Sequence, residues 1–206
     1  MCGIIAAASN RHVGKLLVQG LHKMEYRGYD SAGIALHQGD KIAHLRALGK
    51  VQLLEEKMIA EKPKSKLGIA HTRWATHGEP SEANAHPHKS KDRVYIVHNG
   101  IIENFASLKK ELSAGGTVFS SETDSEVVAH LVAIEYDKSQ DLKQAFMVVV
   151  NRLEGAFTLL CVHQDHSDVV FAARRNSPLV IGLGEGENFL GSDVAAFVEH
   201  TKHAVS

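Results

Sequence analysis

The second residue of the chain combines two groups that can do covalent chemistry together. Removal of Met1 leaves Cys2 with a thiol and a free α-amine on one residue. An α-amine has a pKa of about 7.7–8.0, so a useful fraction is neutral near pH 7 and can accept a proton. A thiol beside such a base is an activated nucleophile that needs no histidine partner. The alternative is a structural cysteine that merely follows Met1, because buried cysteine of that kind is common.

An Asn-Gly pair, Asn99 and Gly100, follows a β-rich run at 94–97. Asn-Gly between β-rich runs is the strongest short signal for a hairpin turn, which is one interpretation. In the other interpretation, the Asn99 side-chain amide and the Gly100 N–H form a two-donor oxyanion site at a strand end. Glycine there lets the backbone approach a tetrahedral centre closely. The sequence leaves both interpretations open.

A third candidate segment, 70–80, leads from an expected strand into a loop that holds Arg73 and the sole tryptophan, Trp74. Arginine suits a two-pronged grip on a carboxylate. The alternative is a surface arginine beside a tryptophan that fills the core. Asp124 opens an expected helix, where a carboxylate also simply complements the helix dipole.

These segments must be positioned by a fold that mixes helices and strands. Helical periodicity occupies 13–24, 105–112, 127–134 and 142–153. Asn104 is expected to cap the second helix, and 123–126 to form a capping box for the third. Short β-rich runs occupy 3–8, 32–37, 41–47, 67–71, 94–97, 156–163, 169–174, 179–182 and 188–191. Several are apolar on consecutive residues, which predicts sheets covered on both faces. The order of elements predicts an α+β domain of stacked layers.

Composition narrows the class of protein. With 206 residues, 44% of them hydrophobic and 23% charged, the chain resembles an ordinary globular domain. A net charge of −1 argues against nucleic acid as a partner. The longest apolar run, 145–150, is far shorter than the ~20 residues of a membrane span. The sequence shows no signal peptide and only two cysteines, so we expect a cytoplasmic protein that does not bind a membrane.

Fourteen histidines raise the possibility of a metal centre. His86 and His88, together with His71, His77 and His98, contain enough imidazoles for a ligand set. The sequence has neither an HExxH motif nor a cysteine pair at zinc spacing, so spacing alone disfavours a metal.

Together these segments resemble the glutaminase domain of glutamine–fructose-6-phosphate aminotransferases, which are class II, N-terminal-nucleophile amidotransferases. An N-terminal Cys-Gly-Ile fits any class II amidotransferase, whereas Tyr-Arg-Gly-Tyr-Asp-Ser and Arg-Trp-Ala-Thr-His-Gly narrow the match to this family. The matching segments are 1–5, 25–33, 71–78, 84–88, 98–104, 121–124 and 177–180, in the family's order along nearly the whole chain.

The resemblance implies a fold and a set of roles. The fold is a four-layer α/β/β/α sandwich of two antiparallel sheets between helical layers. The reaction is hydrolysis of L-glutamine to glutamate and ammonia, without any cofactor or metal. The implied catalytic residues are Cys2, its supports Arg27 and Gly28, and the oxyanion donors Asn99 and Gly100. The implied substrate-binding residues are Arg73 for the α-carboxylate, Asp124 for the α-ammonium, and Trp74, Thr76 and His77 in the loop.

Two departures from the family qualify the resemblance. The family continues past Ser206 through further strands into a sugar-isomerising half, so residues 1–206 are expected to be a truncated glutaminase domain. Fructose 6-phosphate would then bind only through that missing half. The full-length enzyme is expected to be a homodimer and this chain a monomer. Met1 is also present in the sequence, and while attached it blocks the amine of Cys2.

Two rival functions remain open. One is the glutaminase domain of another class II amidotransferase, such as a phosphoribosylamine-forming or asparagine-forming enzyme. The other is a non-catalytic module that senses glutamine and keeps Met1.

Overall fold

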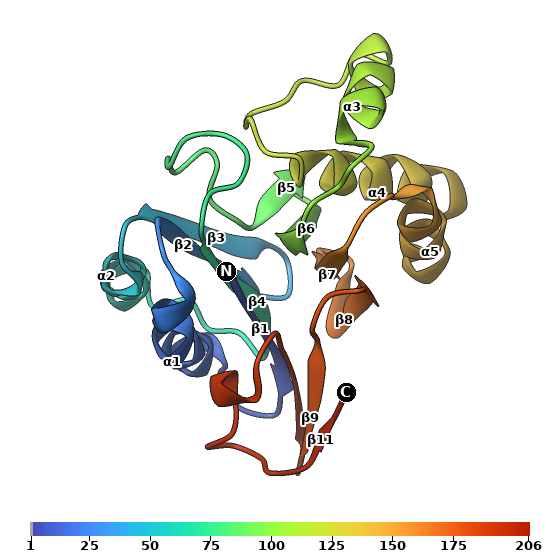
Figure 1. Ribbon diagram of the computed structural model, residues 1–206. Helices are drawn as coiled ribbons and strands as arrows, with labels where there is room; N and C mark the ends of the chain where they lie inside the picture. Colours follow the sequence, from blue (N-terminus) through green and yellow to red (C-terminus); the bar gives the residue numbers. More distant parts are fainter. Residues whose placement is uncertain (1) are drawn as a thin grey trace.

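The computed structural model describes residues 2–206, which form two antiparallel β-sheets stacked between two layers of helices (Figure 1). The seven-stranded sheet has the order β11-β9-β10-β1-β4-β2-β3. Its strands are β1 (Gly3–Ser9), β2 (Ser31–His37), β3 (Ile42–Leu48), β4 (Leu67–Arg73), β9 (Val180–Gly184), β10 (Glu187–Gly191) and β11 (Ala204–Val205). The four-stranded sheet, β5-β6-β7-β8, consists of β5 (His88–Ser90), β6 (Val94–Gly100), β7 (Phe157–His163) and β8 (His166–Arg175).

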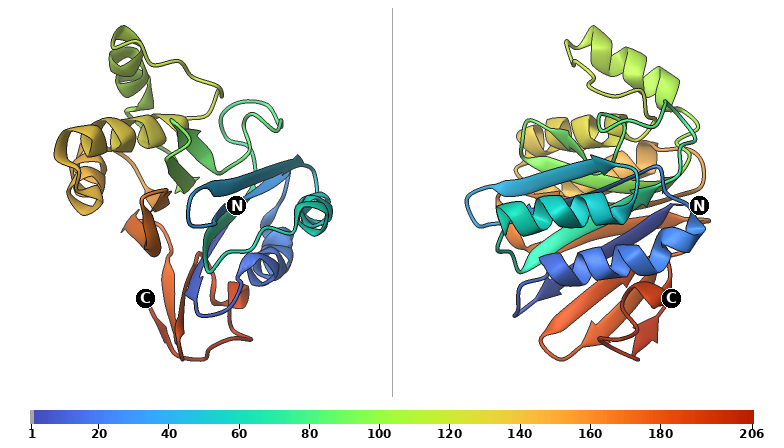
Figure 2. Two further views of the ribbon diagram at one scale, coloured as in Figure 1. Left: turned by 180° about the vertical axis from the view of Figure 1, so that it is seen from behind. Right: turned by 90° about the vertical axis from the view of Figure 1, so that its left-hand side faces the viewer.

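Helices cover the outer face of each sheet, as the two views of Figure 2 show. The helices α1 (Gly14–Met24) and α2 (Val51–Glu61) cover the seven-stranded sheet, and α4 (Glu126–Ser139) and α5 (Leu142–Arg152) cover the other. The helix α3 (Phe105–Ala114) packs beside α4, and 3₁₀ turns occupy Glu25–Arg27 and Val194–Ala196. This is the expected four-layer α+β sandwich. No helix within residues 2–206 combines the length and apolar character that crossing a membrane requires.

The strands predicted from the sequence are all present, but the fold also contains short or weakly patterned elements that the prediction lacks. The helix α2 is one of them, because only Val51 and Leu54 are buried along it and its apolar pattern is weak. The strands β5 and β11 are the others, and they have only three and two residues.

Asn104 stands at the N-cap position of α3 as predicted, but neither predicted cap makes its side-chain hydrogen bond. The Asn104 side chain caps nothing and instead bonds the Arg152 carbonyl and the Glu154 N–H, which ties down the chain after α5. At α4 the residue before the first turn makes no capping hydrogen bond with its side chain. The Glu126 carboxylate there accepts the N–H groups of Ser120 and Ser121. In both places the side chain that a capping motif would use forms hydrogen bonds with groups outside the helix instead.

Each helical layer packs on its sheet through an apolar core, and a third core lies between the two sheets and leads directly to the candidate site. Its side chains alternate along the strands and include Ile4, Ala6, Leu67, Ile69, Tyr95, Val97, Leu160 and Val162. Residues two apart on a strand share a face. Cys2, His71 and Asn99 therefore extend the inward-facing rows of β1, β4 and β6 at one end of the space between the sheets.

Candidate active site

A cavity of about 360 Å³ opens at that end of the sandwich. Both sheets and the loops that follow β4 and β6 contribute to its wall. Of the ten site residues predicted from the sequence, all except Gly28 line it: Cys2, Arg27, Arg73, Trp74, Thr76, His77, Asn99, Gly100 and Asp124. Gly28 lies just behind, with a φ of 113°, and a Cβ there would approach the Trp74 ring to 2.7 Å.

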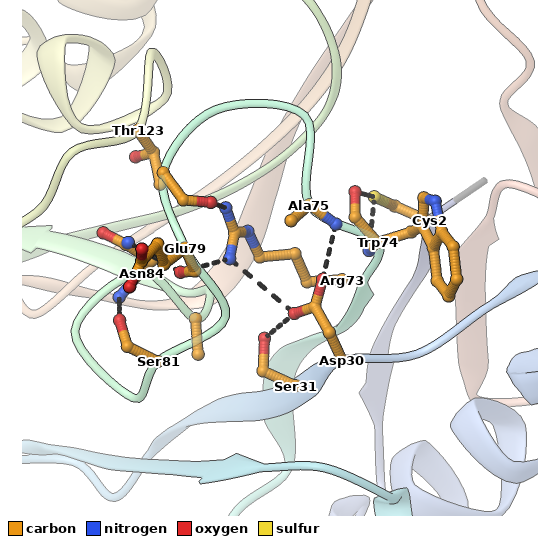
Figure 3. A network of polar contacts seen from close by, with 12 residues as sticks. Cys2, Asp30, Ser31, Arg73, Trp74, Ala75, Glu79, Ser81, Asn84 and Thr123 are labelled. Carbon is orange, nitrogen blue, oxygen red and sulfur yellow. Dashed lines mark hydrogen bonds and ion pairs between the residues drawn. The ribbon is translucent and has the colours of Figure 1, made fainter.

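Cys2 directly precedes β1, and its sulfur lies against the backbone of Trp74 (Figure 3). The Trp74 N–H donates to Sγ at 3.2 Å, and Sγ lies 3.5 Å from the Trp74 carbonyl oxygen. Burial raises the pKa of the thiol above its ordinary value, and the Trp74 backbone hydrogen bond only partly opposes this. The sulfur is therefore a thiol near neutral pH and needs a base before it can attack.

Arg27 supports this end of the strand. Its guanidinium donates to the backbone oxygen and to Oγ of Ser192, both at 3.3 Å. The same Oγ accepts the Ile4 N–H at 3.0 Å. Arg27 is thus linked to the first residues of β1 through Ser192.

Asn99 and Gly100 end β6 and do not form a hairpin turn. They pair with Thr158 and Phe157 of β7, which excludes the turn interpretation. Gly100 has a φ of 116°, and a Cβ there would lie 2.1 Å from the Ala156 carbonyl oxygen, so only glycine fits. The Asn99 amide nitrogen donates to the Cys2 carbonyl oxygen at 3.1 Å. Two potential hydrogen-bond donors, the Asn99 amide and the Gly100 N–H, thus line the same cavity as Cys2.

Arg73 is buried at the end of β4, and its guanidinium holds the loop that follows (Figure 3). It donates to the carbonyl oxygens of His77, of Gly78 at 3.0 Å and of Glu79 at 3.3 Å. An incoming carboxylate would have to replace some of these oxygens. Trp74, by contrast, is 55% exposed, so it does not fill the core.

Asp30 lies behind the site and supports it, and the sequence analysis did not select it, although it belongs to the matched segment 25–33. Its carboxylate accepts the Ala75 N–H and the Ser31 hydroxyl, and lies 3.7 Å from the Arg73 guanidinium. It fixes both the start of the loop and its arginine. The only local signal is a carboxylate directly before a strand, which is too general to assign a role.

Asp124 closes the cavity from the side of the other sheet. It is buried, and its Oδ2 accepts the Ile102 N–H at 2.7 Å. Its Oδ1 lies 3.9 Å from His77 Nδ1 at the cavity wall. Oδ2 is therefore committed to the backbone, whereas Oδ1 accepts the Ser125 hydroxyl at 3.4 Å and faces the His77 side of the cavity.

Among residues 2–206, no group of three or more His, Cys, Asp or Glu side chains is arranged so that it could hold a metal ion. Burial lowers the pKa of His71 to about 3 and that of His98 to about 4. The pKa values of His86 and His88 are lowered for the same reason. These rings are therefore neutral near pH 7, and His86 and His98 line the cavity.

Comparison with known proteins identifies the family of the chain. A family model described as "Glutamine amidotransferase domain" matches residues 71–199. The chain belongs to the glutamine amidotransferase domain family. Its curated relatives named "Glutamine--fructose-6-phosphate aminotransferase [isomerizing]" include proteins of Leifsonia xyli subsp. xyli (55% identical) and Corynebacterium glutamicum (54%). Each match covers 100% of this chain and 34% of the relative, so the chain spans about a third of their length.

Solved structures agree on the fold of this amidotransferase domain. A glutamine phosphoribosylpyrophosphate amidotransferase from B. subtilis superimposes with a TM-score of 0.82 at 25% identity. A structure described as the allosteric regulatory enzyme of purine biosynthesis gives a TM-score of 0.84 at 27% identity. Both matches cover 97% of this chain and 44% of the other. These proteins are enzymes, and the amidotransferase domain of this chain has their N-terminal-nucleophile architecture.

Proposed function

We propose that this domain hydrolyses L-glutamine to L-glutamate and ammonia, with Cys2 as the nucleophile. The observation that carries the proposal is the meeting of Cys2, Asn99 and Gly100 at one cavity wall, although they come from different sheets. Met1 lies outside the described residues, so its removal is part of the proposal. The alternative is a glutamine-sensing module that keeps Met1, and the mass of the intact chain distinguishes the two.

The side chains suggest an order of events. The free amine of Cys2 takes the thiol proton, and the sulfur attacks the side-chain amide carbon of glutamine. The Asn99 amide and the Gly100 N–H stabilise the negative oxygen of the tetrahedral intermediate. The ammonium of Cys2 returns the proton to the leaving nitrogen, and ammonia departs. Water then attacks the thioester, which releases glutamate and restores the thiol.

The remaining residues would hold the amino-acid end of glutamine. Arg73 is the group for the α-carboxylate, and it exchanges loop carbonyls for carboxylate oxygens as glutamine binds. The Asp124 Oδ1 is the group for the α-ammonium. Trp74, Thr76 and His77 complete the wall, while Arg27 and Gly28 support the nucleophile and the Trp74 ring.

We further propose that the ammonia serves the synthesis of glucosamine 6-phosphate from fructose 6-phosphate. The support is the name carried by relatives 48–55% identical to the chain over its whole length. This domain has about a third of the length of those relatives. The sugar would therefore bind outside the part that corresponds to this domain. Amidotransferases acting on other acceptors share the fold at a lower identity of 25–27%, which favours the sugar phosphate.

The first test is a glutamate-release assay combined with intact mass. The processed chain should lack one methionine residue and should release glutamate and ammonia in equal amounts. A chain that keeps Met1 and binds glutamine without turnover would favour the sensing module instead.

Asn99→Ala should lower kcat by about 10²–10³-fold and leave KM nearly unchanged, because an oxyanion donor acts mainly in the transition state. Steady-state kinetics with glutamate detection measures both constants. A variant that changed only KM would place the oxyanion site elsewhere.

Arg73→Ala should raise KM for glutamine more than it lowers kcat, because a carboxylate is gripped equally before and during the reaction. Arg73→Lys is the matched control, because it keeps the charge but loses the two-pronged geometry. Its KM should lie between that of the parent chain and that of Arg73→Ala. A second comparison uses substrate analogues, one that keeps the α-carboxylate but lacks the α-ammonium and one that lacks the carboxylate. Arg73→Ala should weaken the binding only of the analogue that keeps the α-carboxylate. An equal effect on the binding of both analogues would contradict the assigned role.

A further inference from the structure

One buried histidine that the proposed mechanism does not use touches an oxyanion donor. His71 lies in β4, paired with Ile4 on one side and Gly33 on the other. Its side chain is fully buried. Its Nε2 lies 3.0 Å from the His98 carbonyl oxygen and 2.9 Å from Asn99 Oδ1.

The His98 carbonyl decides which ring nitrogen of His71 carries the proton. A carbonyl oxygen can only accept, so Nε2 must be the N–H donor. An N–H facing the Asn99 side chain requires an acceptor there, which is Oδ1. The amide nitrogen of Asn99 is thereby turned to the other side, where it donates to the Cys2 carbonyl oxygen at 3.1 Å. The orientation of the amide therefore follows from the acceptor character of the His98 carbonyl oxygen.

The other ring nitrogen is consistent with this assignment. His71 Nδ1 is buried and has no hydrogen-bond partner among residues 2–206. An unprotonated nitrogen loses less there than an N–H would, because an unmatched buried donor is rarely tolerated. Burial also lowers the pKa of His71 to about 3, so the ring carries a single proton near neutral pH.

The plane of the His71 ring is held by a second imidazole. His86 stacks on it with ring centroids 4.1 Å apart and an angle of 18°. The segment bearing His86 reaches this place because Gly33 has no side chain: a Cβ there would lie 1.9 Å from the His86 carbonyl oxygen. The His98 N–H donates to His86 Nδ1 at 3.2 Å, which fixes the stacked ring in turn.

We propose that His71 is the positioning residue of the oxyanion site: as an Nε2–H donor it keeps the Asn99 amide turned with its NH₂ group toward the reacting centre. Without this donor only the hydrogen bond to the Cys2 carbonyl holds the amide, which then rotates more readily and presents its oxygen, which would repel the oxyanion. The inference rests on the proposed role of Asn99. It adds a residue that never touches glutamine.

Kinetics of paired variants test the proposal. His71→Leu removes the donor and should lower kcat by about 10–100-fold with KM changed less than about threefold. His71→Gln places an amide N–H donor near the same point and should recover activity to within about fivefold of the parent chain. In the Asn99→Ala background, His71→Leu should cost less than about threefold more, since its effect passes through Asn99.

A residue that only packs the core would behave differently. The losses of activity caused by His71→Leu and by Asn99→Ala would multiply in the double variant, and KM would change together with kcat. The His71→Gln variant would be no more active than the His71→Leu variant. Any of these results overturns the proposal. If Asn99→Ala itself left kcat unchanged, the proposed oxyanion site would fail first, and the two failures are thus distinguishable.

A measurement on the parent chain covers the case in which His71→Leu does not fold. Long-range ¹⁵N–¹H NMR of histidine-labelled protein distinguishes the two neutral tautomers of an imidazole. His71 should show a protonated Nε2 and an unprotonated Nδ1 near neutral pH. A proton on Nδ1 would overturn the assignment.

Discussion

Replacing Cys2 by alanine should reduce glutamate release to the level of a protein-free blank. No other side chain among the described residues at the cavity wall is a nucleophile of comparable strength, and the base proposed for the reaction belongs to the same residue. The fold should persist, because the hydrogen bonds of Sγ involve only the Trp74 backbone. Circular dichroism and thermal unfolding provide that control.

Cys161 offers a matched comparison within the same chain. It is fully buried in β7, and burial raises the pKa of its thiol to about 12. Cys161→Ala should therefore retain turnover, and an electrophilic glutamine analogue should add its mass to the peptide that begins at Cys2. Labelling of Cys161, or glutamate release by the Cys2→Ala variant, would refute the mechanism.

Mild acid should destabilise this domain steeply. Burial lowers the pKa values of six histidines well below the ordinary value of 6.5: His44, His71, His86, His88, His98 and His163. Well above that value they are neutral in both the folded and the unfolded chain, and they impose no penalty. As the pH falls through the ordinary value of 6.5, the histidines of the unfolded chain bind protons that those of the folded chain do not bind. The free energy of unfolding therefore decreases as the pH falls.

The size of this effect is large for a single domain. Each such histidine contributes at most about 1.4 kcal/mol per pH unit, so six together cost on the order of 7 kcal/mol between about pH 6 and pH 5. That is comparable with the whole stability of a typical domain, about 5–15 kcal/mol. Urea unfolding at a series of pH values from about 7.5 to 5 measures it, with the midpoint falling throughout the lower half of the range.

Two variants identify the groups responsible. His44→Gln keeps a donor for the Pro87 carbonyl and should reduce the pH dependence by roughly one part in six. His12→Gln, at an exposed position, is the control and should leave the dependence unchanged. A midpoint that stayed flat as the pH fell through this range would mean that the buried rings accept protons without opening the structure.

The sequence predicted what depends on local pattern. Runs of consecutive apolar residues identified the buried strands, and Cys2 and Arg73 are chemically specific enough to be selected by residue type and position. Asp124 required the resemblance to a family, because a carboxylate at a helix start is commonplace. The strand-end position of Asn99 could not be decided, because it depends on pairing with Thr158, far along the chain. A local turn signal and a distant strand partner compete there, and only the fold decides.

The same reason explains the supporting residues whose roles the sequence did not reveal. Asp30 and His71 matter through what they face, namely the Ala75 N–H and the Asn99 amide. Neither partner is near in sequence. Asn104 and Glu126 show the reverse error, since a capping pattern was present but groups outside the helix used the side chains.

The two halves of the proposed catalytic apparatus belong to different sheets: Cys2 precedes β1 of one, and Asn99 and Gly100 end β6 of the other. The distance from sulfur to oxyanion donors is therefore set by the thickness of the apolar layer between them. Small side chains such as Ala6 and Ala35 help to set that thickness. Enlarging one of them to gain stability would shift one sheet against the other, so protein engineers should treat this layer as part of the active-site geometry.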